Sequence, residues 1–189
     1  MLSQQRRHFN SLFEADADPW GYRTRFTERR RHALVLAVLD RPTYPRAFEP
    51  ACANGVFTSL LAGRCGTLLA SDASPAAVAL SKASTAGQRN VTVKRQELPD
   101  EWPAGSFELI VLIDFLYYLP APEVGRLTSL ASGSLTADGT LLVAHWQGTA
   151  DDFVTPTAEV HRIVRARLGR APDSRLDDRH HLVDMWVRQ

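Results

Sequence analysis

Two carboxylates stand directly after short apolar stretches of the chain. Glu49 ends "RAFE", and Asp72 ends "TLLASD" 23 positions later. Between them, residues 50–55 ("PACANG") are mostly small, which lets a ligand approach the backbone. An acidic residue at about this distance can hold a ribose, because one carboxylate accepts hydrogen bonds from two neighbouring hydroxyls. The pair predicts a nucleoside-bearing cofactor. A plain turn with an aspartate capping a helix is the alternative.

The first loop narrows the choice of nucleoside. A dinucleotide fingerprint needs three glycines around the pyrophosphate, whereas this loop has one, Gly55. The carboxylate of Glu49 repels a pyrophosphate but can pair with an ammonium group. S-adenosylmethionine carries both an ammonium and a ribose, so it fits better than a nicotinamide dinucleotide. Two alternatives stay open: an NAD(P)-dependent Rossmann oxidoreductase, and a protein that binds S-adenosylmethionine without catalysis.

A second group of residues that can do chemistry is "DFLYYLP", residues 114–120. Here Asp114 follows an apolar strand-like run, and Tyr117 and Tyr118 come soon after it. Aromatic rings at such a place can stack on a sugar or surround a cation. Packing of the two tyrosines against a neighbouring helix is the alternative.

His145 and Trp146 end a later strand-like stretch. An unperturbed histidine titrates near neutrality, so His145 can take a proton from an attacking amine or hydroxyl. A structural histidine is the alternative. The candidate catalytic residues are therefore His145, Asp114 and Tyr117.

The segment "DPWGYR" near the start of the chain is a candidate lid. In that reading Trp20 covers the reactive face of the cofactor and Arg25 meets its carboxylate. The alternative is that Trp20 anchors the leading helix. His180 and His181 have no partner at metal-ligand spacing, so we expect both to be solvated in a hairpin turn and no metal site to exist.

The elements that must position these groups alternate between helix and strand. Helices are predicted for residues 3–15, 24–39, 55–65, 74–85, 121–135 and 155–169, and strands for 46–50, 67–72, 90–96, 107–114, 137–146, 171–178 and 181–189. Alternation of this kind predicts an α/β fold with a parallel sheet and helices on both faces. The last two strands are too close for a crossover helix, so they should pair antiparallel at the sheet edge.

The composition is that of one ordinary globular domain. Of 189 residues, 44% are hydrophobic and 23% are charged, and the formal net charge is +1. This balance gives no general reason to expect a nucleic-acid or membrane partner. The opening "MLSQQRRHFN" lacks the apolar core of a signal peptide, and the strongest apolar run, "LIVLI", is far too short to span a bilayer. We therefore expect a cytoplasmic protein.

Several segments in combination resemble class I S-adenosylmethionine-dependent methyltransferases and, more narrowly, the nodulation protein S family. They are "DPWGYRTRFTERRRHAL", "FEPACANG", "LLASDASPAAVALS", "VKRQELPDEWPAGSFELIVLIDFLYYL", "GTLLVAHW" and "HHLVDMWVR". The resemblance implies a Rossmann-like class I methyltransferase fold, with a seven-stranded, mostly parallel sheet and an antiparallel last strand. It also implies S-adenosyl-L-methionine as cofactor and S-adenosyl-L-homocysteine as product. One departure is Ala51, where the motif usually has glycine; if this position needs a positive φ, the alanine weakens the site.

The resemblance further implies that four groups of residues surround the cofactor. They are Glu49, Ala51 and Gly55; Asp72, Ala73 and Ser74; Gln96, Glu97 and Leu98; and Asp114 and Phe115. The first group would line the methionine part, the second the ribose, the third the adenine and the fourth the mouth where the methyl is transferred.

The sequence therefore predicts an enzyme, a single-domain methyltransferase in which residues 1–40 form N-terminal helices and a lid, and residues 41–189 bind the cofactor. The family resemblance implies N-methylation of an amino group on a small molecule or a chitooligosaccharide-like amino sugar. We expect a monomer or weak homodimer.

Overall fold

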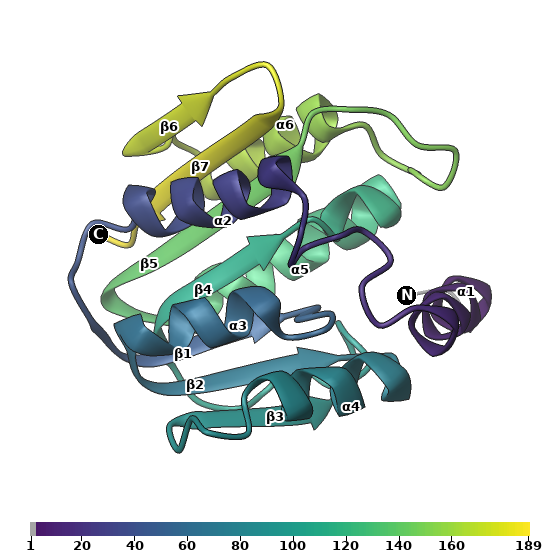
Figure 1. Ribbon diagram of the computed structural model, residues 1–189. Helices are drawn as coiled ribbons and strands as arrows, with labels where there is room; N and C mark the ends of the chain where they lie inside the picture. Colours follow the sequence, from purple (N-terminus) through teal and green to yellow (C-terminus); the bar gives the residue numbers. More distant parts are fainter. Residues whose placement is uncertain (1–2) are drawn as a thin grey trace.

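The computed structural model describes residues 3–189, and its centre is one seven-stranded sheet (Figure 1). The strands lie in the order β3-β2-β1-β4-β5-β7-β6. Their bounds are β1 Tyr44–Pro50, β2 Cys65–Asp72, β3 Val91–Arg95, β4 Phe107–Ile113, β5 Leu135–Trp146, β6 Ser174–Asp177 and β7 His181–Val187. The pairs among β1 to β5 are parallel, and β7 is antiparallel to both β5 and β6. The predicted α/β class, the mostly parallel sheet and the antiparallel end are confirmed.

Helices cover both faces of the sheet, as Figure 1 shows. Their bounds are α1 Ser3–Ala15, α2 Phe26–Val38, α3 Val56–Leu61, α4 Pro75–Ser84, α5 Ala121–Gly133 and α6 Thr157–Leu168, with short 3₁₀ turns η1 Ala62–Arg64 and η2 Leu116–Tyr118. One core lies under α2 and α3, and a second core lies under α5 and α6. Helix α1 stands apart, beyond the carboxyl ends of the strands, where it packs against α4 (Figure 1).

Local chemistry explains where these elements begin and end. The Ser74 hydroxyl accepts a hydrogen bond from the backbone N–H of Ala77 at 3.1 Å, and Pro75 opens α4, as the sequence predicts. Helix α6 ends at Gly169, which has a φ of 71°.

The predicted helix over residues 55–65 was too long: α3 ends at Leu61, and Cys65 already begins β2. A short apolar run is compatible with either a buried helix or a buried strand, so the sequence pattern alone does not show where α3 ends and β2 begins.

No helix in residues 3–189 is both long enough and apolar enough to cross a bilayer. The cytoplasmic location stays a prediction, as does the division of the chain at residue 40.

Candidate functional site

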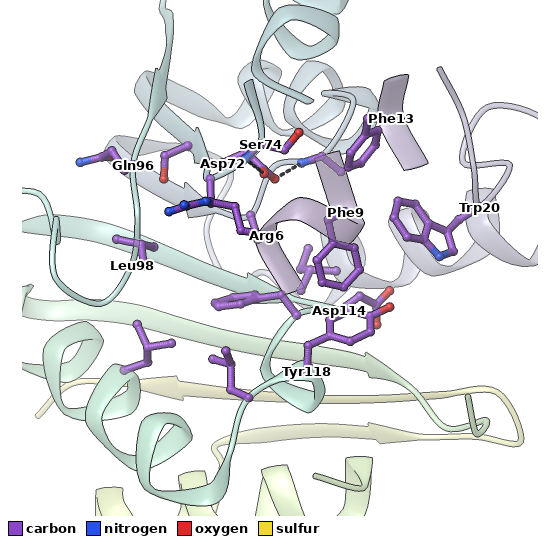
Figure 2. Close-up of a pocket in the computed structure, with 18 of the residues that line it drawn as sticks. Arg6, Phe9, Phe13, Trp20, Asp72, Ser74, Gln96, Leu98, Asp114 and Tyr118 are labelled. Carbon is purple, nitrogen blue, oxygen red and sulfur yellow. Dashed lines mark hydrogen bonds between the residues drawn. The ribbon is translucent and has the colours of Figure 1, made fainter. Parts of the chain in front are cut away.

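A cavity lies at the carboxyl edge of the sheet, between α1 and the loops that follow β1, β2, β3 and β4 (Figure 2). Its walls are largely apolar with a few polar groups, which is the usual character of a small-molecule site. The predicted site residues that line it are Trp20, Ala51, Asp72, Ala73, Ser74, Gln96, Leu98, Asp114 and Phe115. The predicted site residues that do not line it are Arg25, Glu49, Gly55, Glu97, Tyr117 and His145.

Asp72 joins the two loops that form the floor of this cavity. Its Oδ1 accepts from the Ser74 backbone N–H at 2.9 Å, and its Oδ2 accepts from the Ala53 backbone N–H at 3.1 Å. Burial raises the pKa of this carboxyl above its usual value. The carboxylate is therefore held at the cavity wall by two backbone donors, in the position expected for a group that accepts from a ribose.

The loop after β1 turns through left-handed backbone. Ala51, Ala53 and Gly55 have φ values of 55°, 50° and 76°. The motif usually has glycine at position 51. With a positive φ, the Cβ of Ala51 crowds the backbone, so the alanine is strained there. The loop is held in this shape by the Cys52 N–H, which donates to the Ser71 carbonyl at 2.9 Å.

We expect Ala51→Gly to raise the free energy of unfolding by about 1 kcal/mol, because glycine removes the left-handed penalty. Urea denaturation followed by circular dichroism measures this. Ala166→Gly is the matched control, since Ala166 is exposed on α6, where glycine should cost about 1 kcal/mol. A loss of stability in both variants would contradict the strain at Ala51.

A buried arginine that the sequence analysis missed lies beside the main cavity and pairs with Asp114 in its wall. Arg31, on α2, forms ion pairs with Asp114 and, at 2.8 Å, with Glu28. Its guanidinium also lies 5.3 Å from the centroid of the Tyr22 ring. Its Nε donates to no residue that the structure describes. Arg25, which we expected to meet the cofactor, is exposed and lies against Gly21 instead.

Glu49 lies near this arginine, in a smaller cavity that shares Tyr22, Ala51 and Asp114 with the main one. Its side chain is buried, and burial raises its pKa to about 8. Within the described part of the chain, Glu49 Oε2 has no hydrogen-bond donor. An unpaired buried acceptor beside an unpaired arginine N–H suits a ligand that carries both an ammonium and a carboxylate.

Helix α1 closes the cavity on the side opposite the sheet, and the sequence analysis did not assign its residues to the site. Phe9 and Phe13 line the cavity, and Phe9 lies 4.7 Å from the Tyr118 ring (Figure 2). The Asn10 side-chain oxygen accepts from the Ser74 hydroxyl at 2.8 Å. The apolar face of residues 3–15 was visible in the sequence, but its partner was not.

Trp20 and Glu97 help to hold this cover in place. Trp20 lines the cavity and also lies 5.3 Å from the Phe13 ring, so it anchors the leading helix, while its contact with the cofactor stays a prediction. Glu97 forms an ion pair with Arg6 of α1, and a second one with Arg95 at 2.7 Å. Glu97 therefore ties α1 to the loop after β3 rather than lining the cavity.

The structure places the predicted base, His145, in the protein interior. Its side chain is fully buried on the sheet face covered by α5 and α6, and its Nδ1 lies 3.1 Å from Nε2 of His161. Burial lowers the pKa of His145 well below its usual value. Tyr117 is also buried, with its ring stacked 3.9 Å from Phe153. Neither residue touches the main cavity.

The prediction that both tail histidines are solvated was wrong for one of them. His180 is exposed, but His181 is fully buried because it begins β7, opposite Trp146 of β5. Two adjacent histidines in the sequence do not reveal where the turn ends and the strand starts.

A family model and individual relatives of known name point to the same protein family. The family model for nodulation protein S matches residues 7–145. Nodulation protein S of Bradyrhizobium diazoefficiens is 31% identical over 103 residues, which are 54% of this chain and 49% of that protein. Nodulation protein S of Sinorhizobium fredii is 30% identical over 106 residues, 56% of this chain and 49% of that protein. The chain thus spans about half the length of the curated relatives it matches.

Solved structures extend the likeness over most of the chain. A putative methyltransferase from Pseudomonas syringae is 38% identical with a TM-score of 0.77, covering 87% of this chain and 100% of that one. The N-methyltransferase NodS from Bradyrhizobium japonicum WM9, in complex with S-adenosyl-l-homocysteine, is 22% identical with a TM-score of 0.83, covering 96% and 97%. The second likeness concerns the fold. Since the family model covers well over half of its residues, this chain belongs to the nodulation protein S family.

Proposed function

We propose that the chain is an S-adenosyl-L-methionine-dependent N-methyltransferase acting on an amino group of a small molecule or a chitooligosaccharide-like amino sugar. The observation that carries the proposal is the pair of unpaired polar atoms, Arg31 Nε and Glu49 Oε2, in the smaller cavity, which shares wall residues with the main cavity that Asp72 lines. This arrangement fits an amino-acid group at one end of a ligand and a ribose further along.

Different residues would bind different parts of the cofactor. Arg31 would bind the carboxylate of the methionine part and Glu49 its ammonium, while Asp72 accepts from the ribose hydroxyls. Gln96 and Leu98 would border the adenine. When bound, the cofactor supplies an electrophilic methyl group on a sulfonium. The chain's task is then to exclude water with α1 and to orient the acceptor near Asp114.

Ligand titration tests the cofactor assignment. In isothermal calorimetry we expect binding of S-adenosyl-L-homocysteine and no binding of NADH. Tight binding of NADH with no response to S-adenosyl-L-homocysteine would support the oxidoreductase instead. Transfer of a radiolabelled methyl to any of a panel of deacetylated chitooligosaccharides and small amines would exclude a binding protein without catalysis.

Asp72→Asn is expected to weaken binding of S-adenosyl-L-homocysteine by about 1.5–3 kcal/mol, roughly 10- to 150-fold in Kd, because the ribose loses charge-assisted hydrogen bonds. Calorimetry measures the change. Asp151→Asn, an exposed loop residue, is the control and should keep the Kd. An unchanged Kd for Asp72→Asn would refute the ribose assignment.

A further inference from the structure

A run of arginines, "RTRFTERRRH" over residues 23–32, begins in the loop before α2, and the candidate site uses only part of it. Arg30 and Arg31 pair with carboxylates of other elements. Arg23 and Arg29 form no ion pair with any described residue. Their positive charges therefore have no counter-ion in the described part of the chain.

Arg23 and Arg29 both line a groove on the surface, which lies between α2 and α3 and reaches the end of α4. Helices α2 and α3 cover the same face of the sheet (Figure 1). The groove, which we call the α2–α3 groove, has a volume of about 540 Å³, in the usual range for a small-molecule site. No aspartate or glutamate of the described chain lines it, and Tyr22 is the single wall residue that it shares with the main cavity.

One part of the groove wall is rich in hydrogen-bond donors. The Arg23 guanidinium is held in place because its Nη2 donates to the Ser84 hydroxyl at 2.9 Å, and that hydroxyl donates to the Asn54 carbonyl at 2.7 Å. The Arg29 side chain is exposed and has no acceptor among the described residues. Two guanidinium groups without a carboxylate attract an anion, and each presents several N–H groups to carboxylate or phosphate oxygens.

His32 adds a buried donor to the same wall. It is 3% exposed and lines both the α2–α3 groove and the smaller cavity. Burial, and then the charge of Arg31, lowers the pKa of His32 to about 3, so its ring is neutral. Its Nε2 lies 3.3 Å from Nη2 of Arg31, which can only donate, so Nε2 accepts and Nδ1 carries the hydrogen. Nδ1 has no partner in the described chain, and a buried donor without an acceptor is destabilising.

The rest of the groove is apolar. Leu36 of α2 and Val56 and Leu60 of α3 line it. Leu60 is 49% exposed, one of three large hydrophobic side chains that the described chain leaves exposed. Covering such a side chain with an apolar group removes it from water, which is favourable. Unpaired cations next to apolar surface suit a ligand that has both an anionic and an apolar part.

We propose that the α2–α3 groove binds a small amphiphilic anion, whose carboxylate or phosphate group meets Arg23 and Arg29 and whose aliphatic tail covers Leu36 and Leu60. A second copy of the chain in a twofold contact centred on the groove would bring the same arginines towards each other. A nucleic acid contacts phosphates over a wide basic surface and would leave the apolar part uncovered. The proposal is independent of the proposed function, because no residue that we assign to the cofactor lines the groove.

Calorimetric titrations with and without saturating S-adenosyl-L-homocysteine test this site. Octanoate and octyl phosphate should both bind, also in the presence of S-adenosyl-L-homocysteine, and the ratio of their Kd values identifies the preferred anionic group. Each methylene removed from the tail should raise the Kd about fourfold. Acetate lacks the tail and octan-1-ol lacks the charge, so neither should saturate the protein up to about 10 mM.

Arg29→Met keeps an apolar stem and removes the charge. It should raise the Kd for octanoate about fivefold, and its combination with Arg23→Met about 20-fold, on the scale of exposed ion pairs. Leu60→Asn should raise it about fivefold, because the tail loses an apolar partner. Arg25→Met is the matched control: Arg25 is exposed in the same segment but does not line the groove, so the Kd should not change. Equal melting temperatures in circular dichroism show that the variants are folded.

The outcomes separate this groove from the main cavity, whose walls are also apolar. If S-adenosyl-L-homocysteine blocks octanoate and the arginine variants leave its Kd unchanged, octanoate occupies the main cavity and the proposal is refuted. The absence of saturable octanoate binding up to about 10 mM, or equal Kd values for octanoate and octan-1-ol, would refute it too. If S-adenosyl-L-homocysteine itself does not bind, the proposed function fails, and the arginine variants still decide whether the groove binds the anion.

Discussion

Gly55→Ala is expected to lower the free energy of unfolding by about 2–5 kcal/mol, the sum of a left-handed backbone penalty and overpacking. Gly55 has a φ of 76° and caps α3. An added Cβ would lie 2.7 Å from the Cα of Ser81 on α4, and 2.6 Å from its hydroxyl oxygen. Backbone cannot swing away as a flexible side chain can, so α3 and α4 must separate. Urea denaturation with two spectroscopic probes measures the loss.

Two other glycines divide this effect into its parts. Gly169 has a φ of 71° but open space around its Cβ position, so Gly169→Ala should lose only about 1–2 kcal/mol. Gly63 has neither a positive φ nor a close neighbour, and Gly63→Ala should not lose stability. Equal losses for Gly55→Ala and Gly169→Ala would show that the contact with Ser81 is unimportant. Because the loop after β1 is the floor of the cavity, Gly55→Ala should also weaken binding of S-adenosyl-L-homocysteine.

Arg31→Met is expected to lower the free energy of unfolding by about 3–5 kcal/mol, because it leaves Asp114 and Glu28 without their cation. The Arg31 side chain is 5% exposed and that of Asp114 is 6% exposed, so water cannot replace the lost partner. Under the proposed function the variant should also lose measurable affinity for S-adenosyl-L-homocysteine. Chemical denaturation and calorimetry give the two quantities separately.

A double-mutant cycle separates the ion pair from the packing of the long side chain. Asp114→Asn in the Arg31→Met background should recover part of the stability, because the stranded carboxylate is gone. Arg30→Met is the matched control: Arg30 pairs with Asp178 at 2.6 Å, but both side chains are partly exposed, and the loss should be at most about 1 kcal/mol. A similar loss for Arg30→Met and Arg31→Met would contradict the special role of Arg31.

The edge of the sheet that carries the site was determined by local sequence. The apolar run that became β4, the Ser74–Pro75 start of α4, and the strand-like stretches before Glu49 and Asp72 each encode their own structure. Since parallel strands end at one edge, carboxylates and aromatic residues that follow strands had to gather there. Most predicted cofactor residues line the cavity for this reason.

What the tertiary structure alone decided is which side chains of the other elements reach this edge. Arg25 immediately precedes α2 and Arg31 lies on it, and only the packing of α2 on the sheet buries Arg31 next to Asp114 while Arg25 stays exposed. His145 ends a strand at the expected edge, yet its side chain turns towards α6 and meets His161, 16 residues away, and Asp184, 39 residues away. Local patterns report periodicity and punctuation within a segment. Contacts between distant segments depend on how whole elements pack, and no local pattern in one chain encodes them.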